Sequence, residues 1–142
     1  MELLAEQVAL PARHLVNLER VNVSSHGVIF RNLSIYMSSL VCNALVNEYK
    51  GRLLIKQWFG KSAGGKHPET LGLVFDHWST NNYFHWIVKS LPRLLVLWQA
   101  RPDCVLLLPA EVPQFIRDTV TLFGFRHTLE LAAGQVIEAQ SL

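Results

Sequence analysis

The segment NNYFHWIVKSLPRL, residues 81–94, predicts a helix whose two sides differ in chemistry. At about 100° per residue, one broad face collects large apolar side chains and the opposite face collects polar ones. The apolar set is Tyr83, Phe84, Ile87, Val88, Leu91, Leu94, Leu95 and Trp98. The polar stripe is Asn82, His85, Lys89 and Arg93. Periodicity alone indicates a helix with one core face and one solvated face.

Two residues do not fit this simple pattern. Trp86 falls near the polar stripe, where a large aromatic side chain is more typical of a groove or of a contact with another domain. Pro92 has no N–H to donate to the carbonyl oxygen of Val88, and its ring crowds that turn, at a cost of about 3 kcal/mol if uncompensated. We therefore expect a kink that changes the direction in which Asn82 and His85 point. A polar helix start after an apolar strand is where ligands bind in open α/β folds.

The chain around this helix divides into two parts with different patterns. Short strand-like runs separated by turn residues predict an antiparallel meander over residues 14–23, 27–30, 33–41 and 52–59. The glycine-rich segment 60–70 predicts a loop. After it, apolar strand candidates alternate with helices, which is typical of parallel βαβ units. The strands are expected at 71–75, 104–109, 127–131 and 135–139, and the helices at about 79–100 and 113–123.

These patterns predict an α/β fold. Residues 1–70 form a strand-rich segment that ends in the loop, and residues 71–142 form part of a Rossmann-like lobe. Pro113 near its first turn and Gly124 just after its last turn delimit the second helix.

Composition excludes several classes of protein. Of the 142 residues 50% are hydrophobic and 17% are charged, so the chain is not disordered. The net charge is +2 and the basic residues are scattered, which argues against nucleic-acid binding. No signal-peptide pattern is present, and no apolar run approaches the ~20 residues of a membrane span. We therefore expect a soluble protein of the cytoplasm, with peripheral attachment to the inner membrane as a variant of that location.

Three further features resemble sites but lack required parts. Cys42 and Cys104 lie far apart in apolar runs and are expected to be inert core thiols. The segment GKSAGGKH, residues 60–67, nearly matches a phosphate-binding loop, but His67 stands where Ser or Thr should bind magnesium. Asp76 and His77 are expected to cap or line the loop after the first apolar strand. No metal or cofactor is predicted.

The segment NNYFHWIVKSLPRLLVL resembles the N-Y-Y/F-H-W-L-L-x-x-L-P-R-L signature of the family-61 glycosyltransferases, which include bacterial capsular-polysaccharide-type transferases. The similarity continues through CVLLLPAEVPQFIRDTVTLFGF and into ELAAGQVIEAQSL. It covers residues 71–142 well and the strand-rich first half only loosely. The resemblance implies transfer of a sugar from a nucleotide-sugar to a glycan or polysaccharide acceptor. It also implies a GT-B architecture of two Rossmann-like lobes.

The resemblance assigns roles to four residues. Asn82 and His85 are the signature polar pair of the family and face the cleft between the lobes. His85 is the predicted catalytic residue, as a general base on an acceptor hydroxyl or as its hydrogen-bond partner. Asn82, Trp86 and Arg93 are predicted to bind substrate. The amide of Asn82 suits sugar hydroxyls or a helix cap. Trp86 is expected to stack on a sugar ring or to pack against the other lobe. For Arg93, the alternative to substrate binding is a structural ion pair.

Lys89 marks a departure from the family pattern, which often has an acidic residue four positions after the histidine. A carboxylate there would orient the imidazole, and a lysine does not. Lys89 is expected to be solvated, or to meet a phosphate or an acidic acceptor.

The resemblance also implies that the chain is half an enzyme. GT-B transferases hold the nucleotide-sugar mainly in the C-terminal lobe, and the donor-site motifs of that lobe have no counterpart here. We therefore expect an acceptor-side fragment or a truncated relative. The alternative is a non-catalytic binding or scaffolding module that pairs with another chain, or with itself, through an open sheet edge.

Overall fold

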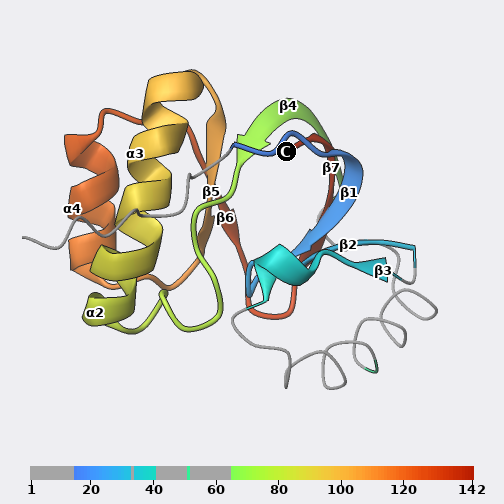
Figure 1. Cartoon of the computed structure of the whole chain (residues 1–142), viewed down its shortest axis with the longest axis horizontal. Coiled ribbons are helices and arrows are strands. Elements are labelled where there is room, and N and C mark those ends of the chain that lie inside the picture. The colour runs from blue at the N-terminus through green and yellow to red at the C-terminus, as the bar shows by residue number, and fades with distance from the viewer. Residues whose placement is uncertain (1–14, 33, 41–50, 52–64) are drawn as a thin grey trace, which may run out of the picture.

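The computed structural model of the protein describes residues 15–32, 34–40, 51 and 65–142. Its strands form a mixed seven-stranded sheet in the order β3-β2-β1-β7-β4-β5-β6, with helices packed beside it (Figure 1). The expected α/β class with parallel strands is therefore confirmed. None of the described helices has both the length and the hydropathy needed to cross a bilayer.

The first strands form the expected antiparallel meander, but the strand expected at 33–41 is wrong in extent, because only Ser34 and Ile35 are strand and a 3-10 turn follows them. β1 (Glu19–Ser24) pairs with β2 (Ile29–Arg31), and β2 pairs with β3 (Ser34–Ile35), before the short 3-10 turn η1 (Met37–Ser39). The turn between β1 and β2 requires Gly27, because its φ is +76° and an added Cβ would lie 2.6 Å from the carbonyl oxygen of Phe75. The strand expected at 52–59 lies outside the described residues.

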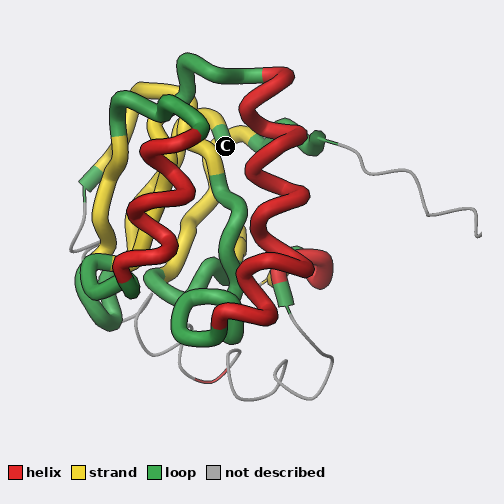
Figure 2. The backbone as a smooth tube through the Cα atoms, turned by 90° about the vertical axis from the view of Figure 1, so that its left-hand side faces the viewer, coloured by secondary structure: helices red, strands yellow, loops and turns green. Residues whose placement is uncertain are grey.

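The second part contains the expected parallel βαβ units. β4 (Lys66–Gly72) lies parallel to β5 (Val105–Pro109), and β5 lies parallel to β6 (Thr128–Leu131). The long helical stretch connects β4 to β5, and α4 (Gln114–Leu122) connects β5 to β6. Both helical stretches cover the same face of these strands, as Figures 1 and 2 show together. The last strand, β7 (Val136–Ser141), lies parallel to β4 and antiparallel to β1, so it joins the meander to the parallel strands.

β4 bends and serves both parts of the sheet. Its residues up to Thr70 pair with β7, whereas Leu71 and Gly72 pair with β5. The register shifts between His67 and Thr70, and Figure 1 shows the strand arching over at the top of the molecule. Pro68 lies in this irregular stretch, where a residue without an N–H is tolerated. The predicted loop therefore extends too far, because residues 66–70 are strand, and the strand predicted at 71–75 ends at Gly72.

The long helical stretch has three segments: α2 (Tyr83–His85), the π-helical turn η2 (Trp86–Ser90) and α3 (Leu91–Ala100). The N–H of Leu91 donates to the carbonyl oxygen of Trp86, which is the wider π spacing, and Pro92 follows in the first turn of α3. The missing N–H of Pro92 thus falls where a new α segment begins, and π turns are a recognised cause of helix bending. The helix is therefore irregular directly before Pro92, where the kink is expected.

The helix buries a different face from the predicted one. Its buried side chains are Trp86, Ser90, Leu94 and Leu97, in one core with the apolar residues of β1, β5 and β7. Five members of the predicted core face are instead between 42% and 67% exposed: Tyr83, Phe84, Val88, Leu95 and Trp98. Apolar side chains occur around most of this helix, so periodicity alone does not select the face that meets the sheet. The prediction of the core face is wrong for these five residues.

Candidate functional site

The loop after β4 is held by one buried carboxylate. Oδ1 of Asp76 accepts hydrogen bonds from the N–H groups of Trp78 and Ser79, both at 3.1 Å. The hydroxyl of Ser79 accepts from the N–H of Asp76 at 2.9 Å. Asp76 therefore caps this loop, as expected from the sequence, and fixes the backbone that carries Trp78.

Arg93 reaches the same loop from α3. Its Nη1 lies 3.3 Å from Oδ2 of Asp76 and 3.3 Å from the carbonyl oxygen of Val74. Both contacts hold the helix to the loop. Of the two roles predicted for Arg93, substrate binding or a structural ion pair, the structure shows the ion pair. The side chain is still partly exposed and lines a neighbouring cavity.

Aromatic side chains surround His85 at the start of the helix. The centroid of its ring lies 5.5 Å from that of Trp78, with the planes tilted by 50°, and 5.8 Å from that of Phe84, in an edge-to-face arrangement. The Nζ of Lys89 lies 5.5 Å from the centroid of the Trp78 ring, within cation–π range. We call these four residues the His85 cluster. Trp78 and Phe84 are exposed and His85 is half-buried, so the cluster presents aromatic rings, one imidazole and one ammonium to solvent.

Asn82 contributes to this cluster through the backbone. It is the N-cap of α2, and its Oδ1 accepts a hydrogen bond from the N–H of His85 at 3.2 Å. Of the two roles open for Asn82, the structure shows the helix cap. The cap fixes the first turn and hence the direction of the His85 side chain.

Trp86 does not belong to the cluster. Its side chain is 0% exposed and lies in the core, so it is not available to a sugar or to a second lobe. Its Nε1 and the hydroxyl of Ser90 have no hydrogen-bond partner among the described residues. The tryptophan beside His85 is Trp78, which sequence reasoning missed. The signal that points to it is the Asp76-x-Trp78-Ser79 spacing, which is typical of a carboxylate-capped turn with the aromatic residue at its tip.

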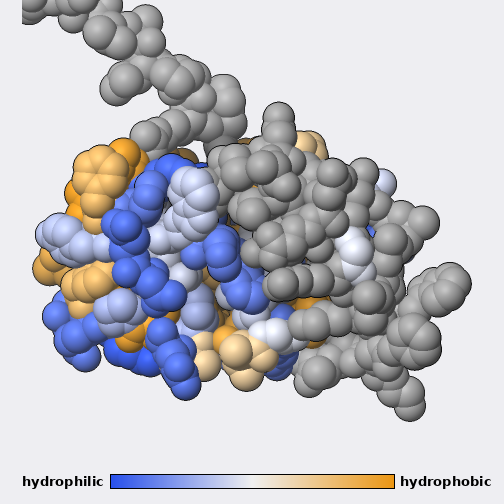
Figure 3. All heavy atoms as spheres, turned by 90° about the horizontal axis from the view of Figure 1, so that it is seen from below, coloured by the Kyte–Doolittle hydropathy of each residue, from blue (hydrophilic) through white to orange (hydrophobic). Residues whose placement is uncertain are grey.

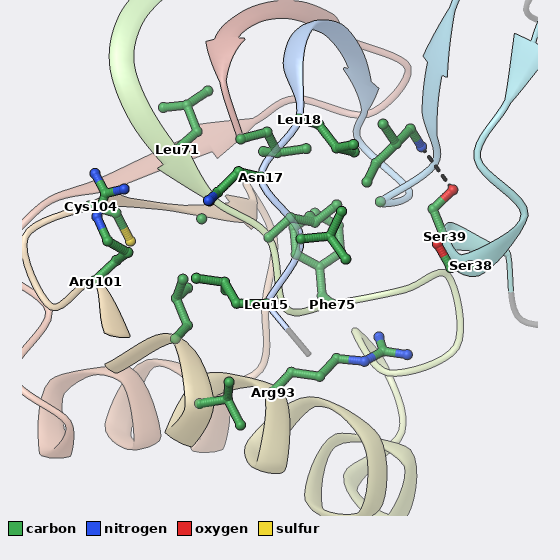
Figure 4. A pocket seen from close by; sticks show the side chains of 18 of the residues that line it. Leu15, Asn17, Leu18, Ser38, Ser39, Leu71, Phe75, Arg93, Arg101 and Cys104 are labelled. Carbon is green, nitrogen blue, oxygen red and sulfur yellow. Dashed lines mark hydrogen bonds between the residues drawn. The ribbon is translucent and has the colours of Figure 1, made fainter. Parts of the chain in front are cut away.

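A cavity of about 480 Å³ adjoins the cluster. It lies between α3, the second half of β4 and the segments 15–18 and 36–39, and Figure 4 shows part of its lining. Lys89 belongs to both sites, because it contacts the Trp78 ring and lines the cavity. Volumes of about 300–1,000 Å³ are typical of small-molecule sites.

Cys104 also lines the cavity and is a free, buried thiol. Burial raises its pKa, the carboxylate of Asp103 raises it further, and the guanidinium of Arg101 acts in the opposite direction. The thiol therefore remains protonated at neutral pH and is a poor nucleophile. This confirms the expected buried thiol for Cys104, whereas Cys42 lies outside the described residues.

The other motif-like segments form no site in the described part of the chain. Lys66 and His67, which end the segment similar to a phosphate-binding loop, lie in β4 and not before a helix. Among the described residues there is no group of three or more His, Cys, Asp or Glu side chains arranged to hold a metal ion.

A scan against models of protein families, a search of curated proteins and a search of solved structures each found no match to this chain. The class of protein is therefore defined by the fold alone, as an α/β protein with a mixed sheet that is compatible with a Rossmann-like arrangement.

Proposed function

We propose that the chain is the acceptor-side part of a glycosyltransferase of the family-61 type, which transfers a sugar from a nucleotide-sugar to a glycan or polysaccharide acceptor. The observation that supports it best is the His85 cluster, in which the centroid of the imidazole lies 5.5 Å and 5.8 Å from those of two exposed aromatic rings. The C–H face of a sugar ring is apolar and packs against an aromatic face, while its hydroxyls need polar partners at the edge. The cluster offers both at one surface.

In this proposal the residues that touch the sugar differ from those that hold them in place. Trp78 and Phe84 pack against the acceptor sugar, and His85 accepts the proton of its attacking hydroxyl or holds that hydroxyl by a hydrogen bond. Asn82 and Asp76 do not touch the sugar; they fix the backbone of His85 and Trp78. The donor site is assigned to a lobe outside these residues.

Binding of sugars to Trp78 is the first test. Oligosaccharides added to the 142-residue chain are expected to shift the NMR signals of the Trp78 indole and of His85. Trp78→Ala is expected to weaken this binding by about tenfold, since stacking on an aromatic ring contributes on the order of 1 kcal/mol. Trp98→Ala is the matched control, because both tryptophans are 43% exposed. An equal loss of sugar affinity in Trp78→Ala and Trp98→Ala would contradict the proposed contact between Trp78 and the sugar.

Testing the catalytic role of His85 requires a measurement of sugar transfer. In an assembly that includes a donor lobe, His85→Ala is expected to lower sugar transfer by at least about 100-fold, the low end for loss of a general base. The thermal midpoint of the fold should stay within a degree or two (~0.5 kcal/mol) because His85 is not a core residue. His127→Ala, at an exposed position after α4, serves as control. Normal transfer by His85→Ala would remove the catalytic assignment.

A second candidate function is the binding or scaffolding module. The observation in its favour is the exposure of three large apolar side chains of the long helix, because Val88, Leu95 and Trp98 are between 42% and 48% exposed. Figure 3 shows apolar atoms at the surface of the helical part of the molecule. Apolar patches on a protein surface are typical of contacts with another chain. Self-association by light scattering, together with absence of sugar binding, would favour the module over the transferase.

A further inference from the structure

The wall of the cavity next to the His85 cluster combines apolar and cationic side chains. Apolar side chains cover most of its wall, among them Leu71, Phe75 and Leu97. Three cationic side chains complete it: Lys89, Arg93 and Arg101. Figure 4 shows Arg101 at one end of the lining, Phe75 near its middle and Arg93 below Phe75, on the helix. No aspartate or glutamate occurs among the described residues of the lining.

The three cations are not equally compensated. Arg93 pairs with the carboxylate of Asp76, and Nε of Arg101 lies 3.7 Å from Asp103. In the described part of the chain no carboxylate lies within 4.0 Å of the ammonium of Lys89, whose contact is the Trp78 ring. Lys89 is therefore the cation with the greatest capacity for an external anion.

Lys89 and Arg93 also stand one helical turn apart on the same side of the helix. Like charges at this spacing repel each other and destabilise a helix slightly. Arg93 is already paired with Asp76, so an anion bound near both groups gains most of its attraction from Lys89. The hydroxyl of Ser38 lies in the same lining and offers a further donor, whereas the hydroxyl of Ser39 already donates to the carbonyl oxygen of Tyr36.

We propose that this cavity binds an amphipathic anion, that is, a small molecule with an apolar chain or ring and a carboxylate or phosphate group. The apolar body lies against Leu71, Phe75 and Leu97, where its burial drives binding. The anionic group lies between Lys89 and Arg93. This site does not depend on sugar transfer and holds whether or not the His85 cluster binds a glycan.

The test compares four probes that differ in one property each, at concentrations below their micelle formation. Decyl phosphate and decanoate carry both an apolar chain and an anionic group, decanol lacks the charge, and inorganic phosphate lacks the chain. Calorimetry with the whole chain is expected to show 1:1 binding of decyl phosphate or decanoate, and the tighter of the two identifies the preferred group. Decanol and inorganic phosphate are each expected to bind at least about tenfold more weakly.

Two variants at one position test the assigned cation. Lys89→Gln is expected to weaken decyl phosphate binding about tenfold, the effect of one hydrogen bond to a charged group, and Lys89→Glu is expected to abolish it. Lys89 is not a core residue, so both variants should fold, as NMR amide dispersion will show. Arg126→Gln removes one positive charge at an exposed position outside the lining and should leave the affinity unchanged.

Three results would overturn the proposal. Decanol binding as tightly as decyl phosphate would mean that the cavity selects only for apolar character. Inorganic phosphate binding as tightly as decyl phosphate would mean that the apolar wall contributes nothing to the affinity. An equal loss of decyl phosphate affinity in Arg126→Gln and Lys89→Gln would mean that the net charge of the protein, and not this cavity, attracts the anion.

Discussion

Trp86→Ala is expected to lower the free energy of unfolding by about 3–5 kcal/mol, the usual cost of removing a buried tryptophan side chain. Trp86 is the largest fully buried side chain among the described residues and is 0% exposed. It packs in the same core as Leu94 of the helix and Leu106 of β5. Its removal leaves a space that the helix and the strands cannot close without losing their other contacts. Urea unfolding, followed by circular dichroism, measures the change.

Two comparisons make this result informative. Trp86→Phe keeps a ring in the core and removes the Nε1 donor that has no partner among the described residues, so its cost should be less than half that of Trp86→Ala. Trp98→Ala removes a tryptophan from the face that the sequence pattern assigned to the core. It should cost no more than about 1 kcal/mol, because that side chain is 43% exposed. A larger loss for Trp98→Ala than for Trp86→Ala would restore the original prediction of the core face.

Asp76→Ala is expected to cost about 2–4 kcal/mol, because hydrogen bonds to a buried charged group are worth about 1.5–3 kcal/mol each. The carboxylate accepts from Trp78 and Ser79 and pairs with Arg93. Most of the cost comes from the backbone donors, since Arg93 is partly exposed and its share of the ion pair is screened by solvent. Released from its turn, Trp78 should become more exposed. A red shift of its fluorescence, resolved against the other tryptophans by the Trp78→Ala background, would report this.

The matched variant for this prediction is Asp76→Asn. The amide oxygen still accepts from the N–H groups of Trp78 and Ser79, whereas the charge and the hydrogen-bond acceptor opposite Arg93 are lost. The expected cost is about 1 kcal/mol or less. If Asp76→Asn were as damaging as Asp76→Ala, the ion pair with Arg93, and not the turn, would be the main role of Asp76.

The candidate site combines residues with two kinds of task. Trp78, Phe84, His85 and Lys89 form the exposed surface, whereas Asn82, Asp76 and Arg93 hold the two chain segments that carry it. Substitutions in the second group are expected to change sugar binding only through displacement of Trp78 or His85. Stability and binding measured on the same variants separate these two effects.

Several elements are predictable from the sequence because their signals are local. The apolar run before Pro109 forms β5, and α4 begins after Pro113 and ends before Gly124, whose φ is +75°. The long helix ends at Ala100, before the Arg101-Pro102 break. Caps, prolines and glycines act through the backbone of their immediate neighbours, so these boundaries need no tertiary information.

Other features depend on partners that are distant in the chain. β4 begins at Lys66 although glycine and proline surround it, because β7, some seventy residues later, supplies its hydrogen-bond partners. His85 and Arg93 are recognisable as polar residues of one stripe. Their partners Trp78 and Asp76 are set by the capped turn that follows β4.

The sequence by itself thus determined the α/β class, the order of most strands and helices and the polar residues at the start of the long helix. Only the tertiary structure decided which face of that helix is buried. Its apolar side chains extend well beyond one narrow face, and Trp86 falls near the polar stripe, so periodicity alone does not fix the orientation. Contact with the leucines of β5 and the π turn before Pro92 select the one that places Trp86 inside and leaves Tyr83, Phe84 and Trp98 outside.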